Sequence, residues 1–317
     1  MNKITFSELK ETRAGFAEGL LEAGKKNPEI YALCADLTPS VKMDLFAQAF
    51  PERFIQVGIA EANMIGIAAG LANSGKTCFA ASFAGFISGR VYDQIRMVAA
   101  YSEKNIKICA SHAGITCGED GATHQMMEDL GLMKMLPNMT VINPCDFNQT
   151  KAATLAVAAH QGPCYLRYGR PAVPNFTPEN QTFEIGKGIL MKEGKDLTFI
   201  ATGHLVSPCL EAAYELQETG IDVEVINIHT IKPLDIEIIL KSVAKTRCVV
   251  TAEEHYKNGG LGESVAGVLA LNLPAPMEMV AMEDVFGESG KPTELLEKFG
   301  LDKKHIIEKA RKVITRK

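Results

Sequence analysis

Short apolar runs alternate with segments of helical periodicity along the first 170 residues. The runs are IYALCAD (30–36), FIQVG (54–58), TCFAAS (77–82), IKICASH (106–112), TVINP (140–144) and PCYLRY (163–168). Continuous apolar runs of this length predict strands that are buried on both faces, as in a parallel sheet. Between them, residues 7–25 and the small-residue segment 61–75 predict helices. The alternation predicts a doubly wound sheet, which binds ligands at the carboxyl ends of its strands.

The rhythm changes at residues 171–190, a segment that contains three prolines and no helical pattern. Further apolar runs follow at 197–203, 222–228, 248–254 and 277–284, with helical segments between them. We therefore predict an α/β fold with two doubly wound domains. The first covers residues 1–180 and has a mostly parallel sheet, and the second is a smaller α/β domain over 190–317.

Composition and charge limit the classes of function. The chain has 317 residues, of which 46% are apolar and 22% charged, which suits two globular domains and excludes a disordered or fibrous protein. Lys and Arg number 33 against 38 Asp and Glu, and no long basic run occurs, so we expect no nucleic-acid partner. No apolar stretch approaches the roughly 20 residues that cross a bilayer, and no secretory signal is visible. We expect a cytoplasmic protein without a membrane segment.

Eight cysteines are spread along the chain, and no two of them form a CxxC pair. Several stand inside the apolar runs, such as Cys34 and Cys109. Small buried hydrophobic side chains are therefore favoured over disulfides or zinc ligands, which agrees with a reducing compartment.

The densest group of polar residues is the glycine-rich segment 111–125, SHAGITCGEDGATHQ. It follows a predicted buried strand and holds His112, Asp120 and His124. Two histidines and an acid on a loop after a strand suit proton transfer or hydroxyl recognition. A metal site and a plain polar surface loop are the alternatives, although spacings of eight and four residues match no zinc signature.

Glu61 is a lone acid that opens a predicted helix of small apolar residues. The helix dipole alone explains many such acids, but a carboxyl buried there would hold its proton and act as a hydrogen-bond donor. Phe83 and Phe86 follow the predicted strand 77–82. They suit either core packing or a flat surface for a planar ring.

Arginine is the residue best suited to recognise phosphate, because its guanidinium is always charged and fork-shaped. Arg167 and Arg170 end the run YLRYGRP, and Arg13 lies on the first predicted helix. Each is a candidate phosphate ligand or a solvated surface charge. Asp36 also stands at the carboxyl end of a predicted strand.

The usual nucleotide-binding patterns GxGxxG and GxxxxGK[ST] are absent. Residues 257–262, KNGGLG, lack a preceding GDG and are interpreted as a structural turn.

Six of these segments, in this order, resemble the transketolase family: ADLTPS, GIAEANMIGIAAGLA, SFAGF, SHAGITCGEDGATHQ, YLRYGRP and EEHYKNGGLGESVA. The resemblance covers nearly the whole chain, but only two of the family's three modules, the pyrimidine-binding and C-terminal domains. It therefore implies the C-terminal subunit of a split transketolase. Its cofactors would be thiamine diphosphate and Mg²⁺, with the ligands for the metal and the diphosphate on a separate N-terminal subunit.

The resemblance also implies roles for single residues. Glu61 matches the family glutamate that hydrogen-bonds the coenzyme pyrimidine, Phe86 matches the aromatic that stacks on it with Phe83 beside, and Asp36 matches an acid near the cofactor. Asp120 matches the residue that binds a donor hydroxyl, and His124 one at the donor carbonyl. The phosphate set comprises His112, Arg170, Arg13 and Ser40. Gly89 departs from the pattern, because some family members have a second tyrosine there.

The implied reaction is transfer of a two-carbon ketol unit from a ketose phosphate to an aldose phosphate, as in the pentose phosphate pathway. The chain would be active only with the N-terminal subunit, in a heterotetramer of two copies of each that also involves self-association. Two alternatives are the beta subunit of the first component of a 2-oxoacid dehydrogenase and an enzyme similar to deoxyxylulose phosphate synthase. A third is a non-catalytic partner that keeps the fold without a working site.

Overall fold

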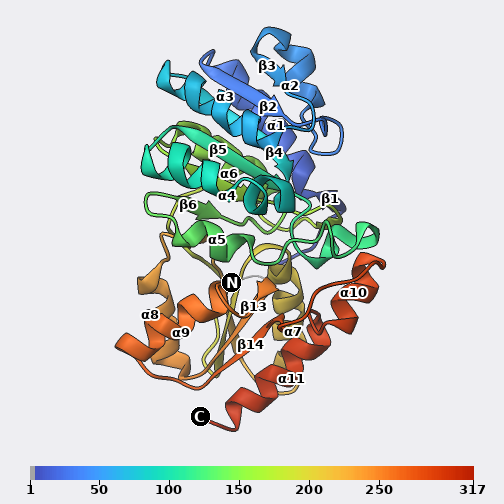
Figure 1. Cartoon of the computed structure of the whole chain (residues 1–317). Coiled ribbons are helices and arrows are strands. Elements are labelled where there is room, and N and C mark those ends of the chain that lie inside the picture. The colour runs from blue at the N-terminus through green and yellow to red at the C-terminus, as the bar shows by residue number, and fades with distance from the viewer. Residues whose placement is uncertain (1–3) are drawn as a thin grey trace.

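The computed structural model describes residues 4–317, which form two larger β-sheets, each flanked by helices, and one two-stranded sheet (Figure 1). The first sheet lies in the upper half of the view and the second in the lower half. The two larger sheets are mostly parallel, so the predicted mixed α/β fold is confirmed.

The first sheet has the strand order β12-β6-β7-β5-β4-β2-β3 within the described residues. Its strands are β2 (Ile30–Cys34), β3 (Phe54–Gln56), β4 (Thr77–Phe83), β5 (Ile106–Ser111), β6 (Thr140–Ile142), β7 (Cys164–Arg167) and β12 (Thr230–Lys232). All neighbours pair in parallel except β12, which is antiparallel to β6. Every residue of β4 and β5 is buried, as their continuous apolar sequences predict.

The connections of the first sheet are mostly helical. The helices are α1 (Thr12–Lys26), α2 (Asp44–Ala49), η1 (Pro51–Arg53), α3 (Glu61–Asn73), η2 (Gly85–Gly89), α4 (Tyr92–Gln94), η3 (Ile95–Tyr101), η4 (Ile115–Asp120), α5 (Asp129–Met135) and α6 (Phe147–Ala159). α1 packs closely on α6, because glycines of α1 face it. A Cβ atom at Gly15 would lie 2.3 Å from the carbonyl oxygen of Phe147, so only glycine fits there.

The second sheet has the strand order β14-β13-β10-β11-β9. Its strands are β9 (Ile189–Lys192), β10 (Leu197–Ala201), β11 (Val223–Asn227), β13 (Val249–Tyr256) and β14 (Met277–Met282). Its helices are η5 (Gly203–Leu205), α7 (Val206–Glu218), α8 (Ile236–Thr246), α9 (Leu261–Asn272), α10 (Pro292–Lys298) and α11 (Lys303–Ile314). β9 is the antiparallel member, at one edge of the sheet.

Two elements differ from the sequence prediction. The helix expected over 7–25 begins only at Thr12, because Leu9–Glu11 forms the strand β1, which pairs with β8 (Ala172–Pro174). β12 comes from the second half of the chain but extends the first sheet, where Thr230 pairs with Ile142. The two halves of the chain are thus joined by a strand as well as by packing.

All eight cysteines are buried and free, as their apolar surroundings predict. Burial raises the pKa of the Cys78 thiol and of the Cys117 thiol to about 12, so both stay uncharged. No helix within residues 4–317 has the length and apolar character needed to cross a membrane.

Candidate active site

The carboxyl ends of four neighbouring parallel strands meet at one edge of the first sheet, in the order β7-β5-β4-β2. Asp36 follows β2, and Phe83 ends β4. His112 follows β5, and Arg170 lies just beyond β7. Four residues that are far apart in the sequence therefore lie along the edge where such sheets bind ligands.

Four rings contact one another at this edge. The ring centroids of Phe83 and Phe86 are 5.8 Å apart, with the planes 23° from parallel. Phe83 also stacks on His112 at 3.9 Å, and His124 meets Phe86 edge-on at 5.3 Å. Phe83 and His112 are buried, whereas Phe86 and His124 are half-buried. The structure thus brings the two predicted stacking residues and both loop histidines into one cluster.

Glu61 is the first residue of α3 and is 3% exposed. Nη1 of Arg90 donates to both carboxylate oxygens of Glu61 at 3.0 Å. The same guanidinium lies over the ring of Phe86, 4.3 Å from its centroid. Glu61 and Phe86 therefore face one planar, hydrogen-bonding group from two sides.

This arrangement tests whether the site fits an aminopyrimidine. Arg90 is half-exposed and shows that a flat group can lie on Phe86 while its edge reaches Glu61. A pyrimidine ring that stacks on Phe86 would make the same two contacts. The residues present therefore fit the ring of thiamine diphosphate, provided that Arg90 moves aside.

Arg13 and Arg170 approach His112 from α1 and from the end of β7. Arg13 donates to the carbonyl oxygen of Ser40 at 3.0 Å and to Oε1 of Glu11 at 2.6 Å. The predicted pair of Arg13 and Ser40 is thus in contact. The charges of both arginines act on His112 and help to lower its pKa.

His112 is held as a neutral imidazole. Burial is the main cause that lowers its pKa to about 3, followed by the positive charges of Arg13 and Arg170. Its Nδ1 lies 2.9 Å from Oγ of Ser111, and its backbone has a φ of 58°, in the left-handed region that side chains other than glycine rarely adopt. At neutral pH this ring can therefore exchange hydrogen bonds with a ligand but adds no charge.

The loop after β5 brings Asp120 close to Arg170. Nη1 of Arg170 donates to the carbonyl oxygen of Cys117 at 2.8 Å and to Oε2 of Glu119 at 3.1 Å, and it lies 3.7 Å from Oδ2 of Asp120. Asp120 is exposed, and it is carried on a loop segment whose first half is buried. The predicted hydroxyl-binding acid and phosphate-binding arginine are therefore neighbours.

Asp36 is the least connected residue of the predicted set. It is exposed, has a φ of 57°, and its backbone N–H donates to Oε1 of Gln56 at 2.7 Å. Within residues 4–317, no ion pair or ring contact joins it to the cluster around Phe83. Its role at the cofactor stays a prediction.

Three residues of possible importance, one arginine and two acids, were missed from the sequence. Arg90 stands four residues after Phe86, a helical spacing that places both side chains on one face, and that spacing is the signal that could have found it. The adjacent acids Glu253 and Glu254 end the apolar run 248–254 in the sequence, as Asp36 ends the run 30–36, and in the structure they lie within β13, which continues to Tyr256. Arg167, in contrast, was considered for phosphate, but it is buried and bonds Asp129 at 2.8 Å and the carbonyl oxygen of Glu254 at 2.8 Å.

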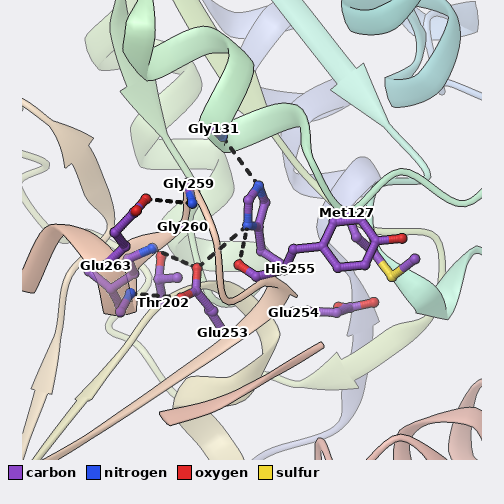
Figure 2. A network of polar contacts seen from close by, with 12 residues as sticks. Met127, Gly131, Thr202, Glu253, Glu254, His255, Gly259, Gly260 and Glu263 are labelled. Carbon is purple, nitrogen blue, oxygen red and sulfur yellow. Dashed lines mark hydrogen bonds and ion pairs between the residues drawn. The ribbon is translucent and has the colours of Figure 1, made fainter. Parts of the chain in front are cut away.

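The segment KNGGLG forms the tight turn that leads into α9, in agreement with the structural interpretation (Figure 2). The carboxylate of Glu253 accepts the backbone N–H groups of Leu261 and Gly262 at 2.6 and 2.7 Å. A Cβ atom at Gly260 would lie 2.1 Å from Oε2 of Glu253. The glycines thus allow a buried carboxylate to cap the helix.

No group of three or more His, Cys, Asp or Glu side chains that could hold a metal ion occurs within residues 4–317.

Two family models match the chain, and several known proteins are similar to it. The pyrimidine-binding domain of transketolase matches residues 9–175, and the C-terminal domain of transketolase matches residues 186–306. The chain is 48% identical over 303 residues to the putative transketolase C-terminal section of Methanocaldococcus jannaschii, with 95% of each chain covered. It is 45% identical over 319 residues to the 6-deoxy-6-sulfo-D-fructose transketolase subunit SqwH of Clostridium sp., covering 100% of this chain and 99% of that one.

The fold is also similar to that of a solved structure described as a split gene transketolase in an inactive beta4 tetramer. The TM-score is 0.91 and the sequence identity 45%, and the match covers 96% of this chain and 98% of the other. These relatives favour a split transketolase over the dehydrogenase and synthase alternatives.

Proposed function

The chain belongs to the transketolase family and corresponds to the C-terminal subunit of a split transketolase, and from this premise we propose the reaction and the roles of its residues. The reaction is transfer of a two-carbon ketol unit from a ketose phosphate to an aldose phosphate. The observation that carries the proposal is the Arg90 guanidinium, which lies on Phe86 and bonds Glu61 where a planar coenzyme ring would do both. We assign residues 1–180 to the pyrimidine-binding domain and 190–317 to the C-terminal domain.

When bound, thiamine diphosphate supplies the nucleophilic carbon and the electron sink that cleavage beside a ketose carbonyl requires. Phe86 stacks on its pyrimidine, Phe83 supports Phe86, and Asp36 lies nearby. Glu61 binds the pyrimidine edge once Arg90 has moved aside. Glu61 is the residue proposed to hydrogen-bond the pyrimidine edge, because it is buried and faces the same space as Phe86.

The substrate lies across the loop and the end of β7. Arg13 and Arg170 supply the positive charge for the sugar phosphate, while neutral His112 and Ser40 add hydrogen bonds. Each of the two arginines is now paired with an exposed or half-buried acid, Glu11 or Glu119, which a phosphate dianion can replace. Asp120 binds a donor hydroxyl, and His124 contacts the carbonyl end of the donor.

The N-terminal subunit completes the site. It provides the ligands for Mg²⁺ and the diphosphate, in a cytoplasmic heterotetramer with two copies of each chain. The tetrameric relative supports self-association of this chain. Pentose phosphates are the proposed substrates, and a sulfonated fructose is a second candidate because one relative is named for it.

The test is reconstitution with the N-terminal subunit. We expect ketol transfer from xylulose 5-phosphate to ribose 5-phosphate only when both subunits, thiamine diphosphate and Mg²⁺ are present. Glu61→Ala in the complex should lower kcat at least about 100-fold, the usual scale for loss of a positioned acid, and leave the melting temperature nearly unchanged. 6-Deoxy-6-sulfofructose is assayed as a second donor.

The matched control is Glu278→Ala. Glu278 is also a buried carboxylate bound by an arginine, Arg316 at 2.7 Å, but it lies on β14 in the second sheet. Its loss should lower stability and leave kcat within about twofold. A Glu61→Ala complex that turns over at a near-normal rate, or activity of this chain alone, would contradict the proposal.

A further inference from the structure

The loop that carries Asp120 is held from the second domain. The backbone N–H of Thr116 donates to Oε1 of Glu254, at the end of β13, over 2.7 Å. Gln125 closes the other end of the loop, because its Nε2 donates to the carbonyl oxygens of Ile115 at 3.2 Å and of Glu288 at 2.8 Å. Figure 1 shows α10 beside this loop, with which it is in contact.

Glycines in the loop bring the two domains closer than any other residue would allow. A Cβ atom at Gly114, where φ is 85°, would lie 2.2 Å from Oε1 of Glu254. One at Gly121 would lie 2.4 Å from Oγ of Ser289. The loop therefore touches the second domain at its start and at its end, and it has no space to move toward that domain.

Glu254 also reaches the residues beside the two phosphate-binding arginines. Its Oε2 is 3.8 Å from Nδ1 of His204, whose side chain is only 9% exposed. Nε2 of His204 lies 3.3 Å from Oγ1 of Thr12, the neighbour of Arg13. A Cβ atom at Gly169, the neighbour of Arg170, would lie 2.2 Å from Cε1 of His204.

The two adjacent acids of β13, Glu253 and Glu254, thus bond to different parts of the protein. Figure 2 shows Glu253 turned toward Gly260 and Glu254 turned away from it, as expected for successive residues of a strand. Glu253 accepts backbone hydrogen bonds within its own domain, where it caps α9. Glu254 serves the first domain, because its acceptor oxygen binds the backbone of the loop.

We propose that Glu254 is a positioning residue for the transferase site: by accepting the N–H of Thr116 and packing on His204, it fixes the loop that presents Asp120 to the donor sugar. This inference rests on the proposed function. A buried carboxylate bonded to a backbone N–H is a strong, directional contact in surroundings of low polarity. The exposed half of the loop, which carries Asp120, contacts Arg170 through partly exposed ion pairs, whereas Glu254 holds the buried half. The C-terminal domain would therefore set donor recognition without touching the substrate.

Hydrogen exchange of the chain tests the positioning directly. In Glu254→Ala, amides 114–121 should exchange at least tenfold faster than in the wild type. Glu254→Asp, which keeps the charge but withdraws the acceptor by one methylene, should give a smaller increase. Glu254→Gln still offers an oxygen to Thr116 and should stay within about threefold. The control Glu253→Ala should speed exchange at the start of α9 and leave 114–121 unchanged.

Kinetics of the complex provide the second measurement. The donor hydroxyl proposed for Asp120 is the one across the bond that breaks, next to the carbonyl carbon, which a ketose phosphate has and hydroxypyruvate lacks. Glu254→Ala should therefore lower kcat/KM about tenfold or more for a ketose phosphate and less than threefold for hydroxypyruvate. Glu254→Gln should restore the ratio of the two donors. Unchanged exchange at 114–121 in Glu254→Ala and Glu254→Asp, or equal losses for both donors, would overturn the inference. If the complex transfers no ketol unit at all, the proposed function fails, but the exchange measurement still decides whether Glu254 holds the loop.

Discussion

The two main sheets of this chain have the same architecture but use the carboxyl ends of their strands in opposite ways. At the carboxyl ends of the strands in the first sheet, Asp36 and Asp120 are exposed and Arg170 is partly exposed. In the second, Glu253 and His255 at the end of β13 are fully buried. The first domain fills the place where the second sheet would otherwise bind a ligand. The carboxyl ends of the strands in a doubly wound sheet can thus bind either a ligand or another domain, depending on how the domains pack.

We call the carboxyl ends of the strands in the first sheet the open edge and those in the second sheet the buried edge. The two edges also differ in the partners that their charged side chains have. At the buried edge, His255 accepts the N–H of Gly131 over 3.2 Å, and the carbonyl oxygen of Glu254 accepts a hydrogen bond from Arg167 of the first domain over 2.8 Å; all four residues are buried. At the open edge, the arginines pair with acids that water or an anion can replace. Charges at the open edge are therefore available for exchange, and charges at the buried edge are committed to the fold.

The largest expected effect comes from removing Arg167, the charged side chain of the first domain that packs against the buried edge. Arg167→Ala leaves Asp129 buried without its ion-pair partner and removes the bond to the carbonyl oxygen of Glu254. We expect a loss of about 3–5 kcal/mol in the free energy of unfolding, the scale for breaking a buried pair. Denaturant unfolding at fixed protein concentration measures it.

Arg170→Ala is the control, since Arg170 stands three residues further along the same strand end and belongs to the open edge. Its ion pairs are partly exposed, so the free energy of unfolding should fall by no more than about 1 kcal/mol. Equal losses in the two variants would show that the two edges do not differ in this respect.

Adding one methyl group at the buried edge, by Gly260→Ala, should lower the free energy of unfolding by an intermediate amount. In Gly260→Ala the new Cβ would lie 2.1 Å from Oε2 of Glu253, which is fixed by two backbone N–H groups and cannot withdraw into solvent. Such overpacking costs about 1–3 kcal/mol. Thermal and denaturant unfolding of the chain would detect the loss.

Gly267→Ala provides the comparison inside α9, the helix that begins directly after Gly260. Nothing lies within 4 Å of a Cβ atom at Gly267, and alanine favours the helix over glycine by about 0.5–1 kcal/mol. A small gain at Gly267 with a loss at Gly260 would locate the tight packing at the buried edge. A gain at both positions would show that the Glu253 cap is loose.

Most strands of the two larger sheets could be predicted, because a strand that is buried on both faces has a continuous apolar sequence. The run 77–82 became β4, and 248–254 became most of β13. Leu9–Glu11 was expected to be helical, but it pairs with Ala172–Pro174 in an antiparallel ladder. A contact across that much of the chain overrides local helix preference, and no local pattern encodes it.

The candidate site shows the same division. Phe83 and His112 could be predicted as neighbours, because each stands at the end of an apolar run and parallel strands align those ends. The contact of Arg90 with Glu61 depends on how two helical segments pack, and the contact of Glu254 with Thr116 depends on how two domains pack. Packing of that kind is not visible in residue types or spacing.

The smallest expected effect concerns pH and the buried acid Glu253. Burial raises the pKa of Glu253 to about 7, while its ordinary value is 4.5, and the N–H groups of Gly262 and Leu261 oppose the rise. His255, Lys134 and Arg167 are the other charged or titratable groups around it. Because the folded state holds this proton more tightly than the unfolded chain does, the stability from Glu253 is complete below pH 4.5 and is lost as the pH rises through 7.

Between pH 6 and pH 8 this loss amounts to about 1 kcal/mol in the free energy of unfolding. Glutamine does not titrate, so Glu253→Gln removes this contribution. Between pH 6 and pH 8 the variant should therefore lose about 1 kcal/mol less unfolding free energy than the wild type. Burial lowers the pKa of the neighbouring His255 to about 4, so in the folded protein this histidine is neutral at both pH values. If the difference in unfolding free energy between pH 6 and pH 8 is the same in Glu253→Gln as in the wild type, Glu253 is ionised at both pH values. The backbone N–H groups at the buried edge would then stabilise a carboxylate as well as water does at the open edge.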